Sequence, residues 1–335
     1  MTSERDFINS IQEYVQKYGH ERESLIKGIG DDCAVLAKAG EDCLLLTTDT
    51  LVEGVHFDLA WHPPYLLGRK CASVNLSDIA AMGGQPKICL LSIGFHGAGQ
   101  TWFDEFMAGF TKALEEYDVL LVGGDTVKSS NELIISVTVL GEGNREQIRY
   151  RSGAKPGDLV WVSGPLGCSA AGLELCRKTQ SHSVENADRQ QLVNAHLDPH
   201  AEVDLGIFLA ACGLVHAMID VSDGLATDLA HLCQVSNVGA EIQQDLLPVS
   251  ESLEGAAREL NVNVFDWVLK GGEDYQLLFT TGPEDEQKLR QLVTERFDRD
   301  IFRLGKIIDE QGVFLCNGTE RHDISYQGYD HFSGQ

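Results

Sequence analysis

The sequence predicts a mixed α/β (α+β) protein with two domains. Helix-like and strand-like segments alternate along nearly the whole chain, which is typical of α/β architectures. The 335 residues exceed the roughly 250–300 at which a single hydrophobic core tends to divide. A turn-rich segment, RSGAKPGDLV at 151–160, lies near the middle of the chain. We therefore expect one domain at 1–150 and a second at 151–335.

Apolar periodicity and capping residues locate the elements of the first half. A helix at 5–18 is predicted to begin at a capping box formed by Ser3 and Asp6. A second capping box, Thr101 with Asp104, is predicted to begin another helix. The other expected elements are helices near 65–82 and 101–117 and strands near 33–37, 43–48, 87–95, 119–124 and 133–142.

The second half repeats the alternation of strands and helices. The polar segment 179–190 is expected to be an exposed loop. Strands are expected at 159–164, 214–222, 275–281, 301–308 and 312–316, and helices near 167–178, 189–196, 201–211, 223–235 and 283–297.

Composition restricts the classes of partner. Lys plus Arg number 26 against 51 Asp plus Glu, a net charge of -25, and such a surface repels nucleic acid and anionic membranes. No apolar run approaches the ~20 residues that span a bilayer, and the first residues lack a signal-peptide pattern. The nine cysteines are scattered without a CxxC pair. This pattern argues against a zinc site and favours a reduced, cytoplasmic compartment.

Acidic residues occur at five predicted strand ends, four of them beside glycine. Ligands bind at such strand ends in open α/β sheets. Taken singly, an Asp after Gly is usually a turn former or a helix cap, and Asp223 is open to that interpretation. Their joint occurrence favours a shared binding site. The segments are GIGDDCAVL with Asp31 and Asp32, LLLTTDTLVEG with Asp49, LLVGGDT with Asp125, AMIDVSDGL with Asp220 and Asp223, and LKGGEDYQLLF with Glu273.

Asp78 lies on the predicted inward face of the helix at 65–82. Leu67, Cys71, Val74 and Asp78 follow one another at spacings that place them on one side of a helix. A buried charge without a partner is costly, so this position requires a cation or a hydrogen-bond network. The alternative is that the stripe ends at the helix terminus and leaves Asp78 half exposed.

Carboxylates and hydroxyls without clustered thiols favour a hard cation. Magnesium prefers oxygen ligands and bridges carboxylates to phosphate oxygens. Calcium accepts the same ligands, but the sequence has no EF-hand loop. It also lacks the P-loop GxxxxGK[ST] and the protein-kinase HRD and DFG motifs, which argues against both of those nucleotide-binding folds.

Eight segments, in order, resemble the thiamine-monophosphate kinases of the aminoimidazole-ribonucleotide-synthetase-like superfamily. They are GIGDDCAVL, TTDTLVEGVHF, NLSDIAAMGG, VGGDT, RSGAKPGD, IDVSDGL, GGEDYQLLF and GYDHF, spread from position 28 to 332. The resemblance implies a homodimer paired through the N-terminal sheets. It also implies an N-terminal domain that binds ATP and magnesium and a C-terminal domain that completes the active site. The implied reaction is ATP plus thiamine monophosphate giving ADP plus thiamine diphosphate, by direct in-line transfer.

The resemblance implies a role for each matching residue, with several Mg²⁺ ions bound directly or through backbone and water. The implied metal ligands are Asp32, Thr47, Thr48, Asp49, Asp78, Asp125, Asp220 and Asp223. The implied ATP contacts are Gly124, Asp125, Arg151 and Ser222, and the implied thiamine-monophosphate contacts are His56, Glu273 and Tyr329. No acid or base is assigned, because the accepting phosphate is already anionic and its transfer requires positioning and charge neutralisation.

Some of these positions have simpler interpretations. Arg151 is also compatible with a surface residue at a domain junction, His56 with a structural histidine, and Tyr329 with a packing anchor. Asp31 is a lesser metal candidate, because an adjacent pair rarely directs both carboxylates at one point. Val127 stands where the resemblance implies a hydroxyl or a smaller residue.

Four other functions fit part of the pattern. Two are enzymes of the same superfamily. Selenophosphate synthetase would carry a reactive cysteine beside an early Gly-rich loop, and the hydrogenase-maturation dehydratase a cysteine near the very C-terminus. Neither feature is found, and the last cysteine is Cys316. A metal-dependent phosphatase also uses acidic strand ends, but it would release phosphate without forming ADP. A divalent-ion binding protein would bind metal independently of nucleotide and leaves the order of the motifs unexplained.

Overall fold

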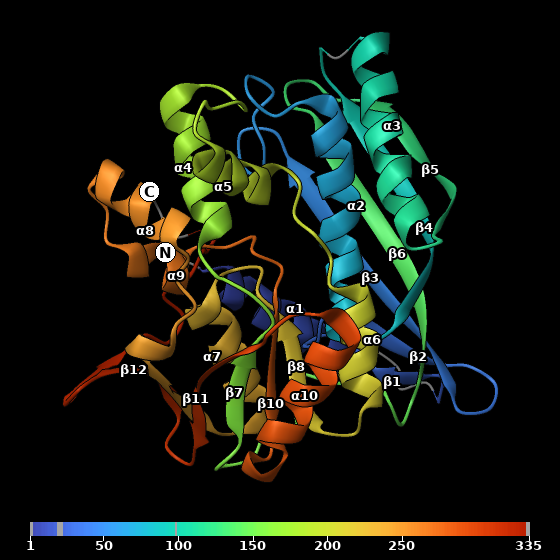
Figure 1. The fold of residues 1–335 in the computed structure, drawn as a ribbon. Helices are drawn as coiled ribbons and strands as arrows, with labels where there is room; N and C mark the ends of the chain where they lie inside the picture. The colour runs from blue at the N-terminus through green and yellow to red at the C-terminus, as the bar shows by residue number, and fades with distance from the viewer. Residues whose placement is uncertain (1–2, 19–22, 98, 333–335) are drawn as a thin grey trace.

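Two β-sheets organise the chain (Figure 1). The structure, a computed structural model, describes residues 3–18, 23–97 and 99–332. The first sheet has the strand order β1-β2-β3-β6-β4-β5 and the second β13-β12-β9-β11-β7-β10-β8. The expected mixed α/β class is confirmed. The expected boundary after residue 150 falls between the two sheets and stays a prediction.

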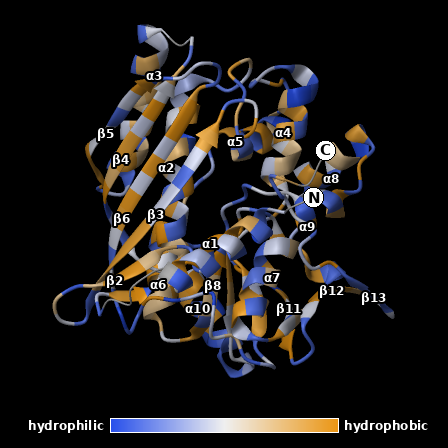
Figure 2. Cartoon of the chain, turned by 180° about the vertical axis from the view of Figure 1, so that it is seen from behind, coloured by the Kyte–Doolittle hydropathy of each residue, from blue (hydrophilic) through white to orange (hydrophobic). Residues whose placement is uncertain are grey.

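The first sheet is antiparallel except where β4 and β5 run parallel. Its strands are β1 (Leu25–Lys27), β2 (Ala34–Ala37), β3 (Asp42–Val52), β4 (Gln85–Phe95), β5 (Leu120–Lys128) and β6 (Ile134–Asn144). The helices of this half are α1 (Glu4–Tyr18), α2 (Pro64–Ala81) and α3 (Gln100–Glu116). Helices α2 and α3 cover one face of the sheet, and Figure 2 shows the other face without helices in front of it.

The second sheet is antiparallel apart from the parallel pair β9 and β12. Its strands are β7 (Leu159–Val162), β8 (Val215–Asp220), β9 (Gly239–Gln243), β10 (Leu277–Thr281), β11 (Phe302–Ile308), β12 (Gly312–Asn317) and β13 (Glu320–Asp323). The α-helices are α4 (Cys168–Thr179), α5 (Ala187–Leu197), α6 (Val203–Ala211), α7 (Leu225–Ser236), α8 (Glu251–Leu260), α9 (Val264–Lys270) and α10 (Glu286–Phe297). Two short 3₁₀ turns are η1 (Gln244–Leu246) and η2 (Pro283–Asp285). The expected loop at 179–190 is shorter than predicted, because α5 begins at Ala187.

One predicted capping box is present and the other is wrong. In α1 the Asp6 amide donates to Ser3 Oγ at 3.2 Å, and the Ser3 amide donates to Asp6 Oδ2 at 2.9 Å. In α3 the N-cap is Gly99, which has no side chain to accept a hydrogen bond. The Asp104 carboxylate accepts instead from the Gln100 side chain at 2.8 Å. The helix therefore begins before the expected Thr101 cap.

Helix α2 is buried along most of its length. Pro63 and Pro64 start it, because a proline at the first helical position loses no helical hydrogen bond. Its packing against α3 is very close: a Cβ added to Gly68 would lie 2.1 Å from the Phe106 carbonyl oxygen. This packing fixes α2 between the two sheets, where it presents polar side chains inside the protein.

The two halves share hydrophobic packing. The core beneath the first sheet contains Trp161 and Phe279 from the second sheet and Leu205 from α6. A second core fills the space between the second sheet and its helices. No helix within the described residues combines the length and apolarity needed to cross a membrane.

Candidate active site

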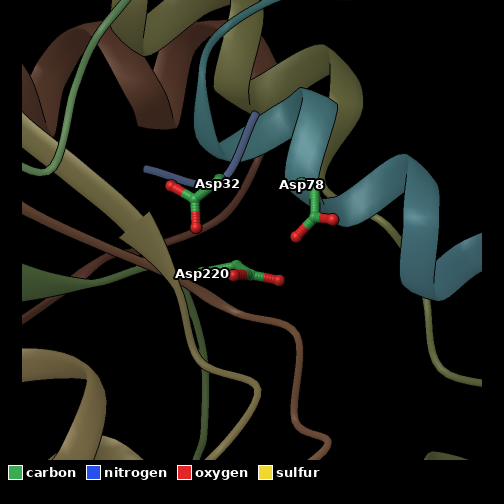
Figure 3. A group of neighbouring side chains, drawn as sticks. All are labelled: Asp32, Asp78 and Asp220. Carbon is green, nitrogen blue, oxygen red and sulfur yellow. The ribbon is translucent and has the colours of Figure 1, made fainter. Parts of the chain in front are cut away.

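Three carboxylates from distant parts of the chain meet between the two sheets. Asp32 precedes β2, Asp78 lies on α2 and Asp220 ends β8. One carboxylate oxygen of each lies within 4.8 Å of the others. Figure 3 shows the three side chains directed toward a common space. We call these residues the aspartate trio.

Each member of the aspartate trio is fixed by a neighbouring donor. Ser77 Oγ donates to Asp220 Oδ2 at 2.6 Å, and Thr47 Oγ1 donates to Asp78 Oδ2. Arg151 donates from Nη2 to Asp32 Oδ1 at 2.6 Å. Asp32 Oδ2 is buried and has no hydrogen-bond partner among the described residues. One oxygen of the trio is thus left open to a further ligand.

Burial and neighbouring carboxylates raise the pKa of four carboxyl groups at this site. Burial and the neighbouring Asp32 raise the pKa of Asp220 to about 7 and that of Asp49 to about 6. Burial and Glu4 raise the pKa of Asp223 to about 6, and burial and Asp49 raise that of Asp78 well above its usual range. Oxygen-only donors, mutual repulsion and an unpartnered buried oxygen fit a hard divalent cation such as Mg²⁺.

A cavity of about 1270 Å³ opens beside the aspartate trio. It exceeds the roughly 300–1,000 Å³ of a typical small-molecule pocket, so it has space for two ligands. Its lining is acidic near the trio, where Arg151 adds a positive charge beside Asp32, and Arg5, Arg177 and Lys270 also line the cavity. The expected residues that line it are Asp32, Thr47, Thr48, Asp49, His56, Asp78, Arg151, Ser222, Asp223, Glu273 and Tyr329.

The loops that carry Ser222, Asp223 and Glu273 are tied to each other. The Glu273 amide donates to the Ser222 carbonyl at 2.7 Å, and the Asp223 amide donates to buried Asp228 at 3.1 Å. Gly224 has a φ of +109°, and a Cβ there would lie 2.9 Å from the Gly271 carbonyl oxygen. Only glycine suits both its conformation and its contact, so the two loops pack as one wall.

The C-terminal segment adjoins this wall and also lines the cavity. The Tyr329 amide donates to the Asp223 carbonyl at 2.9 Å, which holds the segment against α7. The ring of His331 lies 5.0 Å from that of His56 and 4.9 Å from that of Tyr329. The His56 Nδ1 accepts from the Val52 amide at 3.1 Å, so its Nε2 is the atom available for a ligand.

Two expected nucleotide residues lie outside this cavity. Gly124 and Asp125 are on the edge strand β5, which is exposed along its whole length (Figure 1). The register places β5 three strands from β3, since Asp49 pairs with Val137, Val137 with Leu91, and Leu91 with Gly124. At ~4.8 Å per strand, Asp125 is roughly 14 Å from Asp49. A single chain therefore does not bring Asp125 to the aspartate trio.

Comparisons with known proteins find matches over nearly the whole chain. Residues 30–142 match the AIR synthase related protein N-terminal domain, and residues 155–316 match the corresponding C-terminal domain. A thiamine-monophosphate kinase of Buchnera aphidicola is 37% identical over 324 residues, which cover 96% of this chain and 97% of that protein. The chain belongs to the thiamine-monophosphate kinase family.

Solved structures of thiamine-monophosphate kinases have the same fold. The structure described as AaThiL complexed with AMPPCP and TMP has a TM-score of 0.80 and 35% identity, covering 93% of each chain. A thiamine-monophosphate kinase from Stenotrophomonas maltophilia has a TM-score of 0.77 and 36% identity, covering 92% of this chain and 94% of that one. The protein is therefore a kinase with the two-domain fold implied by the resemblance.

The structure of this kinase adds residues that the sequence did not indicate. His331 joins the wall formed with His56, and its place within the GYDHF segment was a usable signal. The Asp228 carboxylate accepts hydrogen bonds from the amides of Asp223 and Gly224 and so fixes that loop. Nothing in the sequence distinguishes Asp228 from other polar residues of a helix. Lys70 and His196 contact Glu273 from behind the cavity wall. No sequence signal marks these two, because they depend on a contact between distant segments.

Proposed function

We propose that this kinase transfers the terminal phosphoryl group of ATP to thiamine monophosphate, a step of thiamine diphosphate biosynthesis. The observation that carries the proposal is one cavity with two chemically different ends. The aspartate trio and Arg151 form an end suited to cation-bound phosphates. His56, Glu273 and Tyr329 form an end suited to an organic acceptor. The related AaThiL structure is described with AMPPCP and TMP, which supports the same pair of ligands here.

Charge neutralisation is the main chemical task of the proposed site. Asp32, Asp78 and Asp220 would hold Mg²⁺, with Asp49 and Asp223 beside them. Bound Mg²⁺ would neutralise charge on the phosphates of both substrates. Arg151 would remain fixed by Asp32 while presenting its guanidinium to the nucleotide. Since the accepting phosphate oxygen is already anionic, we propose direct in-line transfer without a general base.

The acceptor would lie between the C-terminal segment and the Glu273 loop. Tyr329 and His331 present aromatic rings beside His56, which suits a flat heterocycle. Burial lowers the pKa of His56, so at neutral pH its ring is uncharged and offers Nε2 as a neutral hydrogen-bonding group. Glu273 faces the same space with an ionised carboxylate.

We propose that the functional unit is a homodimer paired through the first sheet. One face of that sheet has no helix in front of it (Figure 2). Leu46 of β3, Leu90 of β4, and Leu120 and Val122 of the edge strand β5 are exposed. An exposed apolar edge strand favours association with another chain. Such a pairing would also explain Asp125, which would serve the site of the partner subunit rather than its own.

The cytoplasm is the proposed compartment. All nine cysteines are free thiols in the structure. Unpaired cysteines in this number are typical of proteins kept in a reducing environment.

A direct assay tests the function. Purified protein with ATP, Mg²⁺ and thiamine monophosphate should form thiamine diphosphate and ADP in equal amounts, and chelation of Mg²⁺ should abolish both. Phosphate release without ADP would indicate a phosphatase, and product from free thiamine would indicate a pyrophosphokinase. Absence of thiamine diphosphate at every magnesium concentration would refute the proposal.

A further inference from the structure

Lys70 is a fully buried lysine that forms an ion pair with one carboxylate, that of Glu273. It lies on α2, and none of its surface is exposed. Its Nζ is 2.9 Å from Glu273 Oε1. Beyond this ion pair, the ammonium has no hydrogen-bond partner among the described residues. Lysine is almost never fully buried unless it is paired, so the contact with Glu273 accounts for its position.

His196 contacts the second oxygen of the same carboxylate. Its Nδ1 lies 3.2 Å from Glu273 Oε2 and 3.2 Å from Ser169 Oγ, and its ring is 1% exposed. Burial and the nearby Lys70 lower the pKa of His196, so the ring is neutral, and a neutral Nδ1 must carry a proton to bond a carboxylate. Burial alone would raise the pKa of Glu273, but Lys70 and His196 lower it overall and keep the group ionised.

The backbone of Glu273 is held in an unfavourable conformation. Its φ is +65°, in the left-handed region that non-glycine residues rarely adopt. The amide hydrogen bond to Ser222 and the neighbouring Asp274, which accepts from the Gly167 and Ser169 amides, fix this conformation. Backbone strain of this kind persists where the surrounding structure determines it, often in binding sites.

We propose that Lys70 and His196 are positioning residues that determine how Glu273 recognises the heterocycle of thiamine monophosphate. They contact both carboxylate oxygens from the protein side, while Glu273 lines the cavity on its other side. Because Lys70 balances its charge, Glu273 acts as a directed hydrogen-bond acceptor for a ligand N–H group rather than as a free negative charge. The inference rests on the proposed function.

Steady-state kinetics with Lys70→Met test the role. This change removes the charge and keeps a side chain of similar length. We expect KM for thiamine monophosphate to rise about tenfold to a hundredfold, as for loss of a charged hydrogen bond, while KM for ATP changes by less than about threefold. His196→Ala should act in the same direction with a smaller effect. Lys112→Met, an exposed lysine of α3, is the matched control and should leave both constants unchanged.

A double-mutant cycle separates positioning from a general structural role. Glu273→Gln and Lys70→Met/Glu273→Gln should have the same KM for thiamine monophosphate, because Lys70 acts only through Glu273. The double variant also removes both buried charges together, so it tests the idea even if Lys70→Met alone does not fold.

Two results would overturn the inference: an unchanged KM in Lys70→Met, or a further rise in KM when Lys70→Met is added to Glu273→Gln. Either result, with wild-type protein still producing thiamine diphosphate, would remove only the positioning role. Failure of the wild type to make the product would instead remove the proposed function.

Discussion

Successive side chains of β3 point to opposite faces of the sheet. Thr47 and Asp49 face the cavity, and Thr48 Oγ1 is turned to the Val137 carbonyl at 3.1 Å. The alternation of a strand requires this arrangement, because successive side chains point to opposite faces. Of the two expected threonine ligands, Thr47 therefore offers its hydroxyl near Asp78, whereas Thr48 has only its backbone on that side.

Asp49→Asn should abolish turnover without destabilising the metal-free protein. Burial raises the pKa of Asp49 to about 6. At pH 8, above this pKa, its carboxyl group is ionised and repels the other carboxylates of the site. Asparagine removes that repulsion, so thermal unfolding in EDTA should occur within about 2 °C of the wild type or above it. Calorimetry and the product assay check both parts.

Asp42→Asn, at the exposed start of the same strand, is the control and should leave activity intact. A fall of more than about 5 °C in the melting temperature of Asp49→Asn would identify Asp49 as a structural residue instead.

The sequence predicts the acidic residues of the site better than the residues that support them. Asp32, Asp78 and Asp220 each lie within a recognisable segment, and the structure brings one oxygen of each within 4.8 Å of the others. Lys70 escaped prediction because α2 is buried on nearly all sides, so a single apolar stripe does not describe it. His196 lies on a short helix with no motif, and only the fold brings it to Glu273.

Strand β5 lies at the edge of the first sheet, so one of its sides is not paired within that sheet. Among the strands that the structure describes, it is hydrogen-bonded only to β4, and every residue from Leu120 to Lys128 is exposed. Position 124 of this strand has to be glycine, because a Cβ there would lie 1.7 Å from the Leu91 carbonyl oxygen. The strand thus packs tightly on its inner side and remains uncovered on its outer side.

Val122→Glu on β5 should dissociate the proposed homodimer. The side chain is 54% exposed in one chain, so a charge there costs the folded monomer little. Buried in a dimer interface, the same charge would be unpaired and strongly unfavourable. We expect sedimentation analysis to show a monomer and activity to fall at least about tenfold, with a similar melting temperature for the monomer.

Thr294→Glu is the control, because it adds the same charge to an exposed position of α10 with a side chain of similar size to valine. The dimer proposal fails if Val122→Glu remains as active and as associated as this control.

Length and periodicity decide which elements the sequence reveals. The long elements α2, β4 and α3 match their expected ranges within about two residues. Strands β1 and β13 have three and four residues, too few to show alternation. Helix α8 was missed although Ser250 caps it, and the expected helix at 283–297 begins as the 3₁₀ turn η2.

At the scale of the whole molecule, Asp49 and Asp125 belong to separate regions of one chain. If both serve one site, that site combines Asp49 of one subunit with Asp125 of the partner subunit. A symmetric dimer then has two such sites, because each subunit supplies both residues.

Mixed dimers test this arrangement. Asp49→Asn and Asp125→Asn proteins should each be inactive, but a mixed dimer would carry both changes in one site and neither in the other. Random mixing at equal amounts should restore roughly a quarter of wild-type activity, because half of the dimers are mixed and each has one intact site. Co-expression with two affinity tags and the product assay measure this. Activity in the mixture no higher than in either variant alone would show that Asp125 does not serve the partner's site.

The aspartate trio has a consequence for how the protein unfolds. Asp32 and Asp78 come from the first half of the chain and Asp220 from the second, so a cation held by all three joins both halves. Without the cation, repulsion among the carboxylates opposes their docking; with it, the free energy of ion binding adds to docking by RT ln(1 + [L]/Kd). The concentration of free divalent ion would then determine the cooperativity of the molecule, and so whether the two sheets melt together or one after the other.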